Sequence, residues 1–316
     1  MHHEAFAGSV RNPFTSGRWI MEPKPQNIWG KSHATWFTCM GVGAALFLNR
    51  VLFDLELGKV LGITVAEWLS LVVIGVGGLI LIADLGKPLH FWKAYRNPLT
   101  SWISVGFIAD IVFCVLAGLW AIPSLELGGV NALGWLPWAG NKPLGLLFQF
   151  LAGTACLIII MYPGLVLASS GSIPLWNSAL VPLQYLAFGF NSALGLAYLS
   201  ARVGVGPIPS PVWLPVLVFL YGIGLLFLLL HLLESWYRHE TGRFSVLRLI
   251  HGDVRNQFVF GALGLGVIVP LALIIASAFN SSSSLTLLAI TGLVGLAGNW
   301  FSKLAIIRAG TYAPFL

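Results

Sequence analysis

The stretch WLSLVVIGVGGLILIA, from Trp68 to Ala83, decides the fold class because it carries no charged residue along its whole length. An α-helix needs about 20 mostly apolar residues to cross the hydrocarbon core of a bilayer, and this run with its neighbours meets that length. Only 9% of the 316 residues are charged and the mean hydropathy is +0.87, whereas a soluble domain carries about 25% charged residues. The chain has too little polar surface to cover a globule in water, so we predict an integral membrane protein.

Apolar runs of similar length recur along the whole sequence. They fall at roughly 33–55, 66–85, 102–122, 144–169, 178–200, 212–234, 257–279 and 285–307. We therefore predict an all-α, polytopic membrane protein with about eight transmembrane helices. The predicted segments are a polar N-terminal extension at 1–32 on the membrane surface or on a partner, the eight-helix domain at 33–308, and a C-terminal tail at 309–316.

The distribution of basic residues bears on the orientation of the protein. An even number of spans puts both termini on one face, named side A here, together with the loops at 86–101, 170–177 and 235–256. Side A receives 13 of the 17 basic residues, and the opposite face, side B, receives 4. The positive-inside rule places side A in the cytoplasm, but basic loops also suit an acidic partner. Both orientations stay open.

The loop between the second and third spans, DLGKPLHFWKAYRNPLTSW at 84–102, is dense in ions and aromatic residues. Pro88 and Pro98 prevent a continuous helix. The composition favours a docking surface for a partner, but an ordinary charged loop whose side chains reach the lipid headgroups has the same composition. The residues we assign to partner docking are Asp84, Lys87, His90, Arg96 and Trp102.

A second cluster, YPGLVLASSGSIPLWN, runs from Tyr162 to Asn177 at the end of the fourth span. Pro163 removes one backbone donor and is expected to loosen the helix there. The Tyr162 hydroxyl can donate to or accept from a quinone carbonyl or hydroxyl. The alternative interpretation is a tyrosine of the interfacial aromatic belt.

Asp110 is the one carboxylate well inside a predicted span. An unpaired charge there is costly, so the side chain must be neutral, paired or directed into a wet cavity. A proton relay, with Glu67 at the side B start of the second span as its outer end, is one hypothesis. The alternative hypothesis is that Asp110 makes a structural hydrogen bond to a neighbouring helix and that Glu67 lies at the level of the lipid headgroups.

Metal and haem sites on this protein are not expected. The three cysteines, Cys39, Cys114 and Cys156, lie inside apolar runs without the CxxC spacing of metal or c-type haem sites. A bis-histidine haem needs two histidines on facing helices well inside the bilayer. His33 and His231 are near spans, but both lie at the edge of one.

The two clusters resemble the NrfD/PsrC family, the membrane subunits of polysulfide reductase and related complexes. The stretches at 84–102 and 162–178 carry the resemblance, and the ending with Gly298, Lys303 and Arg308 is also similar. The resemblance covers most of the sequence in span order. It implies an eight-helix, haem-free fold in the cell membrane, an iron–sulfur partner subunit and usually a molybdopterin catalytic subunit. It also implies exchange of quinol and quinone, menaquinone or ubiquinone, near a docking face that many such complexes place outside the cytoplasm.

The resemblance also implies roles for individual residues. The tyrosine of the YPG motif is a quinone ligand in this family, and Tyr162 occupies that position. Trp36 stands near the position where a histidine is expected, and His33 lies about one helical turn closer to the surface. We assign Tyr162, His33, Trp36 and Asn177 to quinone binding, and Asp110 and Glu67 to proton transfer.

The sequence therefore predicts a haem-free membrane subunit of a multisubunit oxidoreductase. It would exchange electrons between the quinone pool and a partner iron–sulfur subunit, with proton transfer as an open part of the hypothesis, and would not catalyse alone because cofactors carry the redox chemistry. One alternative is a quinone-independent anchor or proton-conducting subunit of a reductase or hydrogenase-type complex. A transporter is a further alternative, although transporters break helices at the midplane and the prolines here lie near one face.

Overall fold

The computed structural model describes residues 23–140, 142–279 and 284–313. Within these residues, eight helical segments are long and apolar enough to cross a membrane. They are α2 (Lys31–Phe53), α3 (Val65–Ala83), α4 (Trp102–Ala121), α5 (Pro143–Ala168), α6 (Leu180–Arg202), α7 (Trp213–Arg238), the seventh span Asn256–Phe279, and α10 (Ser284–Ala309). The predicted all-α, polytopic fold is confirmed, and each helix lies within a few residues of its predicted run.

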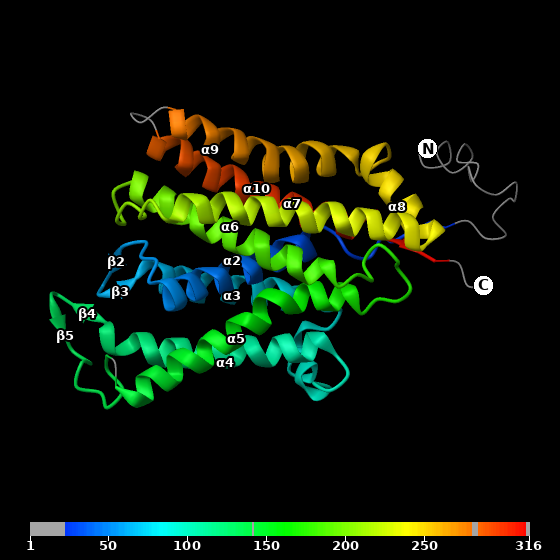
Figure 1. Cartoon of the computed structure of the whole chain (residues 1–316). Helices are drawn as coiled ribbons and strands as arrows, with labels where there is room; N and C mark the ends of the chain where they lie inside the picture. The colour runs from blue at the N-terminus through cyan, green and yellow to red at the C-terminus, as the bar shows by residue number, and fades with distance from the viewer. Residues whose placement is uncertain (1–22, 141, 280–283, 314–316) are drawn as a thin grey trace, which may run out of the picture.

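Two helices, α2 and α6, form the centre of the bundle and are the most buried of the eight. On one side α2 contacts α3 and α5, and α4 packs against α5. On the other side α6 contacts α7 and α10. Figure 1 shows these two groups of helices on either side of the central pair, with α4 and α5 along one edge and α9 and α10 along the other.

The seventh span is not a regular α-helix. Its first part, η3 (Asn256–Ile268), is a π-helix, and α9 (Val269–Phe279) continues it as an α-helix. π-Helical segments are rare and normally short. A glycine contact holds η3 against α10, because a Cβ atom on Gly298 would lie 2.0 Å from the Cα atom of Gly266. A side chain at Gly298 would collide with the backbone of Gly266, so glycine at position 298 lets the two helices lie this close.

The connections on side A contain more structure than the sequence predicts. The 3₁₀ segment η1 (Pro88–Arg96) follows α3, and the helix α8 (Glu240–Ile250) lies in the predicted loop at 235–256. The guanidinium of Arg243 lies 4.2 Å from the ring centroid of Trp236 and fastens α8 to the end of α7. The helix was missed because its short stretch of mixed polarity resembles a charged loop.

Side B carries two small hairpins. The strands β2 (Lys59–Val60) and β3 (Ile63–Thr64) pair between α2 and α3. The strands β4 (Glu126–Leu127) and β5 (Val130–Asn131) pair between α4 and α5. Both hairpins lie at the end of the bundle opposite to the chain termini in Figure 1, as the predicted topology requires.

The N-terminal and C-terminal segments are joined on side A. Strand β1 (Lys24–Pro25) pairs antiparallel with β6 (Thr311–Tyr312). The side chain of Gln26 donates to the carbonyl of Ile307 at 2.9 Å and accepts from the backbone N–H of Trp29 at 2.9 Å. The described part of the N-terminal extension, 23–30, thus lies on the protein's own C-terminal segment. Residues 1–22 lie outside the described residues, so the division at 1–32, 33–308 and 309–316 stays a prediction.

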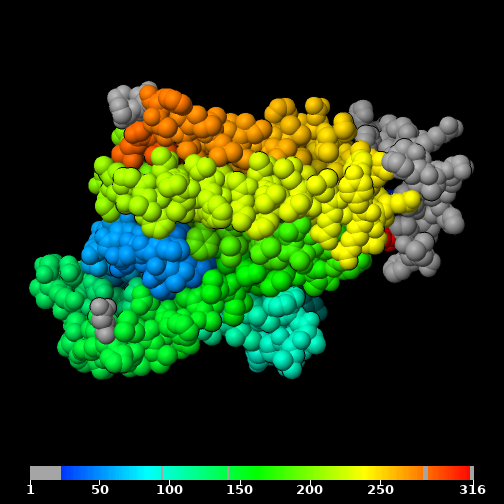
Figure 2. All heavy atoms as spheres, viewed as in Figure 1, coloured from blue at the N-terminus to red at the C-terminus, as the bar shows by residue number. Residues whose placement is uncertain are grey.

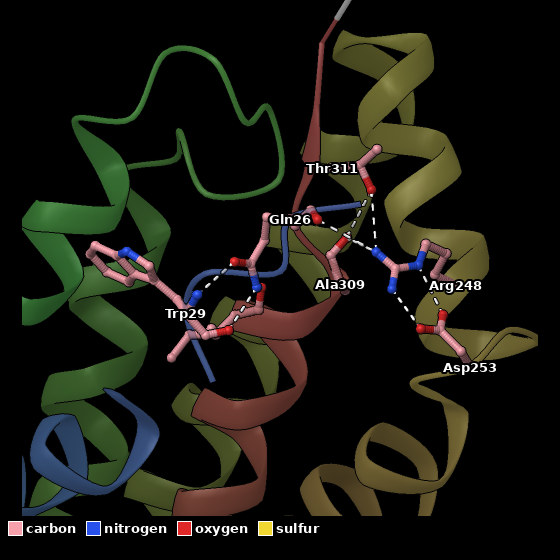
Figure 3. Close-up of polar contacts among 8 residues, drawn as sticks. Gln26, Trp29, Arg248, Asp253, Ala309 and Thr311 are labelled. Carbon is pink, nitrogen blue, oxygen red and sulfur yellow. Dashed lines mark hydrogen bonds and ion pairs between the residues drawn. The ribbon is translucent and has the colours of Figure 1, made fainter. Parts of the chain in front are cut away.

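Arg248 of α8 completes this junction (Figure 3). Its guanidinium donates to both carboxylate oxygens of Asp253, at 2.9 and 2.6 Å. The third nitrogen donates to the carbonyls of Ala309 and Gly310 and to Thr311 Oγ1, at 3.3 to 3.5 Å. The carbonyl of Ala309, the last residue of α10, and that of Gly310, which follows it, are therefore capped by a cation.

The structure corrects the charge count for side A. The 13 basic residues assigned to side A include Lys303 and Arg248, but both are buried inside the protein. Lys303 donates to Asn299 Oδ1, and its ammonium lies 4.7 Å from the ring centroid of Tyr185. These cations face protein groups, so they contribute nothing to the positive-inside comparison, and the orientation stays open.

Candidate functional site

Tyr162 lies inside the bundle, not in an interfacial belt. Its side chain is fully buried on α5. The ring packs on the backbone of α4 at Gly106, where a Cβ atom would come within 2.4 Å of the ring. The helix α5 continues through Pro163 to Ala168, so the proline does not open the helix end as predicted. The phenol is held by the contact between α4 and α5.

Asp110 is the polar partner of Tyr162. The Tyr162 hydroxyl donates to Asp110 Oδ2 over a long distance of 3.5 Å. Asp110 is 9% exposed, and its other oxygen, Oδ1, has no hydrogen-bond partner among the described residues. The structure thus brings together a predicted quinone ligand and a predicted proton carrier that are 52 residues apart in sequence.

Trp36 covers the other face of the phenol. The rings of Trp36 and Tyr162 stack with centroids 5.9 Å apart and an angle of 24°. The indole nitrogen of Trp36 is buried and has no hydrogen-bond partner in the described part of the protein. Buried polar atoms normally have partners. The unpaired donor on Trp36 and the unpaired acceptor on Asp110 fit a small polar group, an ordered water or a quinone headgroup.

His33 extends this arrangement towards side A. Its Nδ1 lies 3.5 Å from Asp84 Oδ2, and its ring centroid lies 6.5 Å from that of Trp36. We name the series Asp84, His33, Trp36, Tyr162 and Asp110 the aromatic row. It runs from the end of α3, across α2 and α5, to the interior of α4. The predicted docking residue Asp84 therefore also touches the predicted quinone site.

Two residues that sequence reasoning missed form the roof of this row. Trp29 stacks on His33 with ring centroids 4.8 Å apart, and it lies 5.3 Å from the ring of Trp176. The Trp176 indole donates to the carbonyl of Ile306 at 2.9 Å, which ties it to α10. Trp29 lies before the first residue of α2, so no helical spacing links it to His33. Both contacts could only be found from the fold.

Two other predicted site residues have partners outside the aromatic row. Glu67 lies at the side B end of α3 with its carboxylate 3.5 Å from Arg50. Asn177 donates from its side-chain amide to the carbonyl of Ala168 at 2.5 Å and closes the loop after α5. The assignment of Glu67 to proton transfer and of Asn177 to quinone binding stays a prediction.

The buried histidine of α7, His231, also has a structural role. Its Nε2 lies 2.6 Å from the carbonyl of Leu175, and its Nδ1 lies 3.0 Å from the side-chain amide of Gln184. Both ring nitrogens are therefore engaged by protein groups. His231 fastens the 169–179 loop to α6 and α7.

The predicted docking loop is an exposed surface of mixed character. Trp92 of η1 lies beneath two cations, with Lys93 Nζ at 5.5 Å and Arg96 Cζ at 5.2 Å from its ring centroid. Leu89 and Leu99 are 88% and 98% exposed. In Figure 2 this segment (cyan) protrudes from the lower edge of the bundle, in the half that carries side A. Such a surface suits either a protein partner or the lipid headgroups.

Comparison with known proteins identifies the family. The sequence model of the family described as "Polysulphide reductase, NrfD" matches residues 19–314. This chain belongs to the NrfD family. It is 25% identical over 305 residues to the C subunit of polysulfide reductase from Wolinella succinogenes, and the match spans 90% of this protein and 94% of that one. It is also 25% identical over 272 residues to protein NrfD of Escherichia coli K12, and that match spans 78% of this protein and 84% of the relative.

Membership of the NrfD family confirms the resemblance that the two clusters indicate. It also agrees with the eight membrane-spanning helices, so this member of the NrfD family is a multi-pass membrane protein. The match at 19–314 includes both the aromatic row and the docking loop. No single residue of the row receives its role from the family name.

Proposed function

We propose that this protein is the membrane subunit of a reductase complex in the cell membrane and exchanges electrons between the quinone pool and an iron–sulfur partner subunit. Its similarity to a protein named as the C subunit of polysulfide reductase supports a place in a reductase of several subunits. The single observation that carries the quinone assignment is the buried group of Trp36, Tyr162 and Asp110, with one donor and one acceptor unpaired among the described residues.

The residues of the aromatic row have complementary tasks in this proposal. A quinol supplies two electrons and two protons when it is oxidised. The Tyr162 hydroxyl and the Trp36 indole hold a carbonyl or hydroxyl oxygen by hydrogen bonds. The Asp110 carboxylate accepts a proton inside the bundle, and His33 with Asp84 provides a second acceptor towards side A. Since Glu67 pairs with Arg50 on side B, a proton path through it needs further groups or water.

The docking loop provides the contact with the partner. The exposed leucines and the cations around Trp92 lie on side A, the same end of the bundle as His33. A partner with an acidic rim around an apolar centre would match this surface. In the proposed complex this partner carries iron–sulfur clusters, and a further subunit carries the molybdopterin or another catalytic centre.

The alternative, a quinone-independent anchor or proton-conducting subunit, has one observation in its favour. The aromatic row is closely packed, and two cavities of the bundle lie elsewhere, one between η3 and α10 and one between α2, α6 and α7. A quinone headgroup would reach Tyr162 only after side chains such as Trp36 move. A closed row that holds only water would still relay protons.

A purified complex with its partner subunits tests the proposal. Tyr162→Phe is expected to lower quinol-dependent turnover by about 10²-fold or more, because the quinone loses a hydrogen-bonding hydroxyl and the proton acceptor Asp110 loses its hydrogen-bond partner. The subunit composition should remain unchanged. The matched control is Tyr221→Phe on α7, a tyrosine that is buried like Tyr162 but whose hydroxyl has no partner among the described residues. Turnover should persist in this control.

Undiminished quinol turnover in Tyr162→Phe would remove Tyr162 from the quinone site. A different result would decide against quinone exchange as a whole: a purified wild-type complex from which no quinone can be extracted and which turns over equally well in quinone-depleted membranes. In that case the anchor alternative stands.

A further inference from the structure

A second site lies far from the aromatic row, in the side B half of the bundle. A cavity of about 580 Å³ lies between α2, α6 and α7. Its volume falls in the range of about 300–1,000 Å³ that is typical of ligand pockets. The wall is aliphatic and aromatic apart from one amide, and includes Phe53, Leu194, Trp213, Val216 and Phe219.

The one amide in this wall belongs to Asn49 of α2. The residue is 3% exposed, and its Nδ2 has no hydrogen-bond partner in the described part of the protein. A buried donor without a partner costs about 1–3 kcal/mol. Rotation about the Cβ–Cγ bond of asparagine is soft, so the amide can present either its nitrogen or its oxygen to the cavity. An occupant with a carbonyl oxygen would satisfy this donor.

The depth of Asn49 indicates the kind of carbonyl. The helix α2 has 23 residues and is about 35 Å long, slightly more than the hydrocarbon thickness of about 30 Å. Asn49 lies four residues before the end of α2, which is about 6 Å inside that end. This position is close to the boundary between acyl chains and headgroups on side B, where the ester carbonyls of phospholipids lie.

We propose that this cavity binds one membrane phospholipid, with an acyl chain between α2, α6 and α7 and an ester carbonyl accepting from Asn49. The rim is open to lipid, since Phe53, Val212 and Phe219 are 50%, 68% and 63% exposed. In Figure 2 the blue α2–β3 region lies directly beside the first turns of α7 (yellow-green). A quinone in turnover needs groups that exchange protons, and the wall has no titratable side chain among the described residues.

The bound lipid would fill the space between α7 and the central helices and so hold them together. Phe53 and Trp213 already meet edge to face at the rim, with ring centroids 5.6 Å apart. Beneath these two rings, the cavity separates the side chains of α7 from those of α2 and α6. An acyl chain restores close packing there, because unfilled apolar space forfeits dispersion contacts. This site is independent of the proposed quinone function.

The test measures lipid retention in the intact complex. The wild-type complex is stripped with excess detergent, and the lipid that remains is identified and counted by native mass spectrometry. We expect one phospholipid per copy of this subunit. Val216→Phe fills the cavity and should lower this retention about tenfold or more. Asn49→Leu keeps the volume but removes the donor, and should weaken retention about fivefold.

Val218→Phe is the matched control, because Val218 lies on the same helix, is 42% exposed and does not line the cavity. It should retain lipid like the wild type. Undiminished retention in both Val216→Phe and Asn49→Leu, no retained phospholipid in the wild type, or a retained quinone in its place would each overturn the proposal. If Val216→Phe does not fold, Asn49→Leu decides. Quinol turnover is not part of this readout, so the lipid site and the quinone site can fail separately.

Discussion

At the scale of single residues, the aromatic row depends on the absence of one side chain. Gly106 on α4 leaves the space that the Tyr162 ring occupies, since any Cβ there would lie 2.4 Å from the ring. The carboxylate of Asp110 lies one helical turn further along the same face of α4. The position of the phenol and the position of its acceptor are thus set by one short stretch of helix.

A methyl group at Gly106 should displace Tyr162. We expect Gly106→Ala to destabilise the protein by about 1–3 kcal/mol, as overpacking of a filled core does, and to lower quinol turnover. Thermal unfolding in detergent and turnover are the measurements. Gly118→Ala on the same helix is the control, because nothing lies within 4 Å of a Cβ there. Equal melting of the two variants would contradict the close packing on Tyr162.

The proposed role of Asp110 as a proton acceptor can be tested separately. Asp110→Asn keeps the shape of the side chain and its hydrogen bond with Tyr162 but removes the proton acceptor. Turnover should fall by about 10²-fold or more, while assembly with the partner subunits stays intact. The control Glu126→Gln changes an exposed carboxylate in the β4 hairpin. Normal turnover in Asp110→Asn would leave Asp110 with the structural role that the sequence also allowed.

At the scale of elements, the 3₁₀ segment η1 and the helix α8 shape side A. The segment η1 exposes aromatic, aliphatic and basic side chains together, and it protrudes from the lower edge of the bundle (cyan in Figure 2). The helix α8 lies in a sequence that predicts a loop, and it brings Arg248 to the end of α10. Both elements are short, so tertiary contacts decide their conformation more than helix propensity does.

Charge reversal on η1 should show whether this segment binds a partner subunit or faces the lipid headgroups. If η1 binds an acidic partner, Lys93→Glu combined with Arg96→Glu places like charges across the interface. The amount of partner that co-purifies should then fall at least severalfold. Lys59→Glu in the side B hairpin is the control. Unchanged recovery of the partner subunits in the η1 variant would favour a headgroup-facing loop.

At the scale of the whole molecule, the junction of the N-terminal and C-terminal segments closes the roof over His33. Strand β6 pairs with β1, and Gln26 positions Trp29, whose ring covers His33. Arg248 holds the other end of this connection through the carbonyl of Ala309 and the hydroxyl of Thr311 (Figure 3). The roof of the site is therefore built from segments at opposite ends of the sequence.

Loss of Arg248 should loosen this roof. We expect Arg248→Met to cost about 1–3 kcal/mol, because the carbonyls that end α10 and the Asp253 carboxylate lose a charged donor. Limited proteolysis should cut the C-terminal strand earlier than in the wild type, and thermal unfolding should shift downwards. Arg202→Met, which removes an exposed arginine on side B, should change neither. An equally resistant C-terminal strand in Arg248→Met would show that β1 alone holds it.

The sequence alone determined the number of spans, their approximate limits, the common face of the two termini and the family. These properties are local, because a run of about 20 apolar residues is recognisable without knowing its neighbours. It also singled out Tyr162, Asp110, His33 and Trp36 one by one, since polar and aromatic residues stand out in apolar runs.

Only the tertiary structure decided that these residues form one row, that Lys303 and Arg248 are buried, and that Asn49 lines a cavity. The physical reason is that lipid is as apolar as the interior of the bundle, so a membrane helix has no polar stripe to mark its outer face. Which side of a helix meets protein depends on glycine contacts such as Gly266 with Gly298 and on long-range pairing such as β1 with β6. Those contacts join positions far apart in the sequence, and no local pattern reports them.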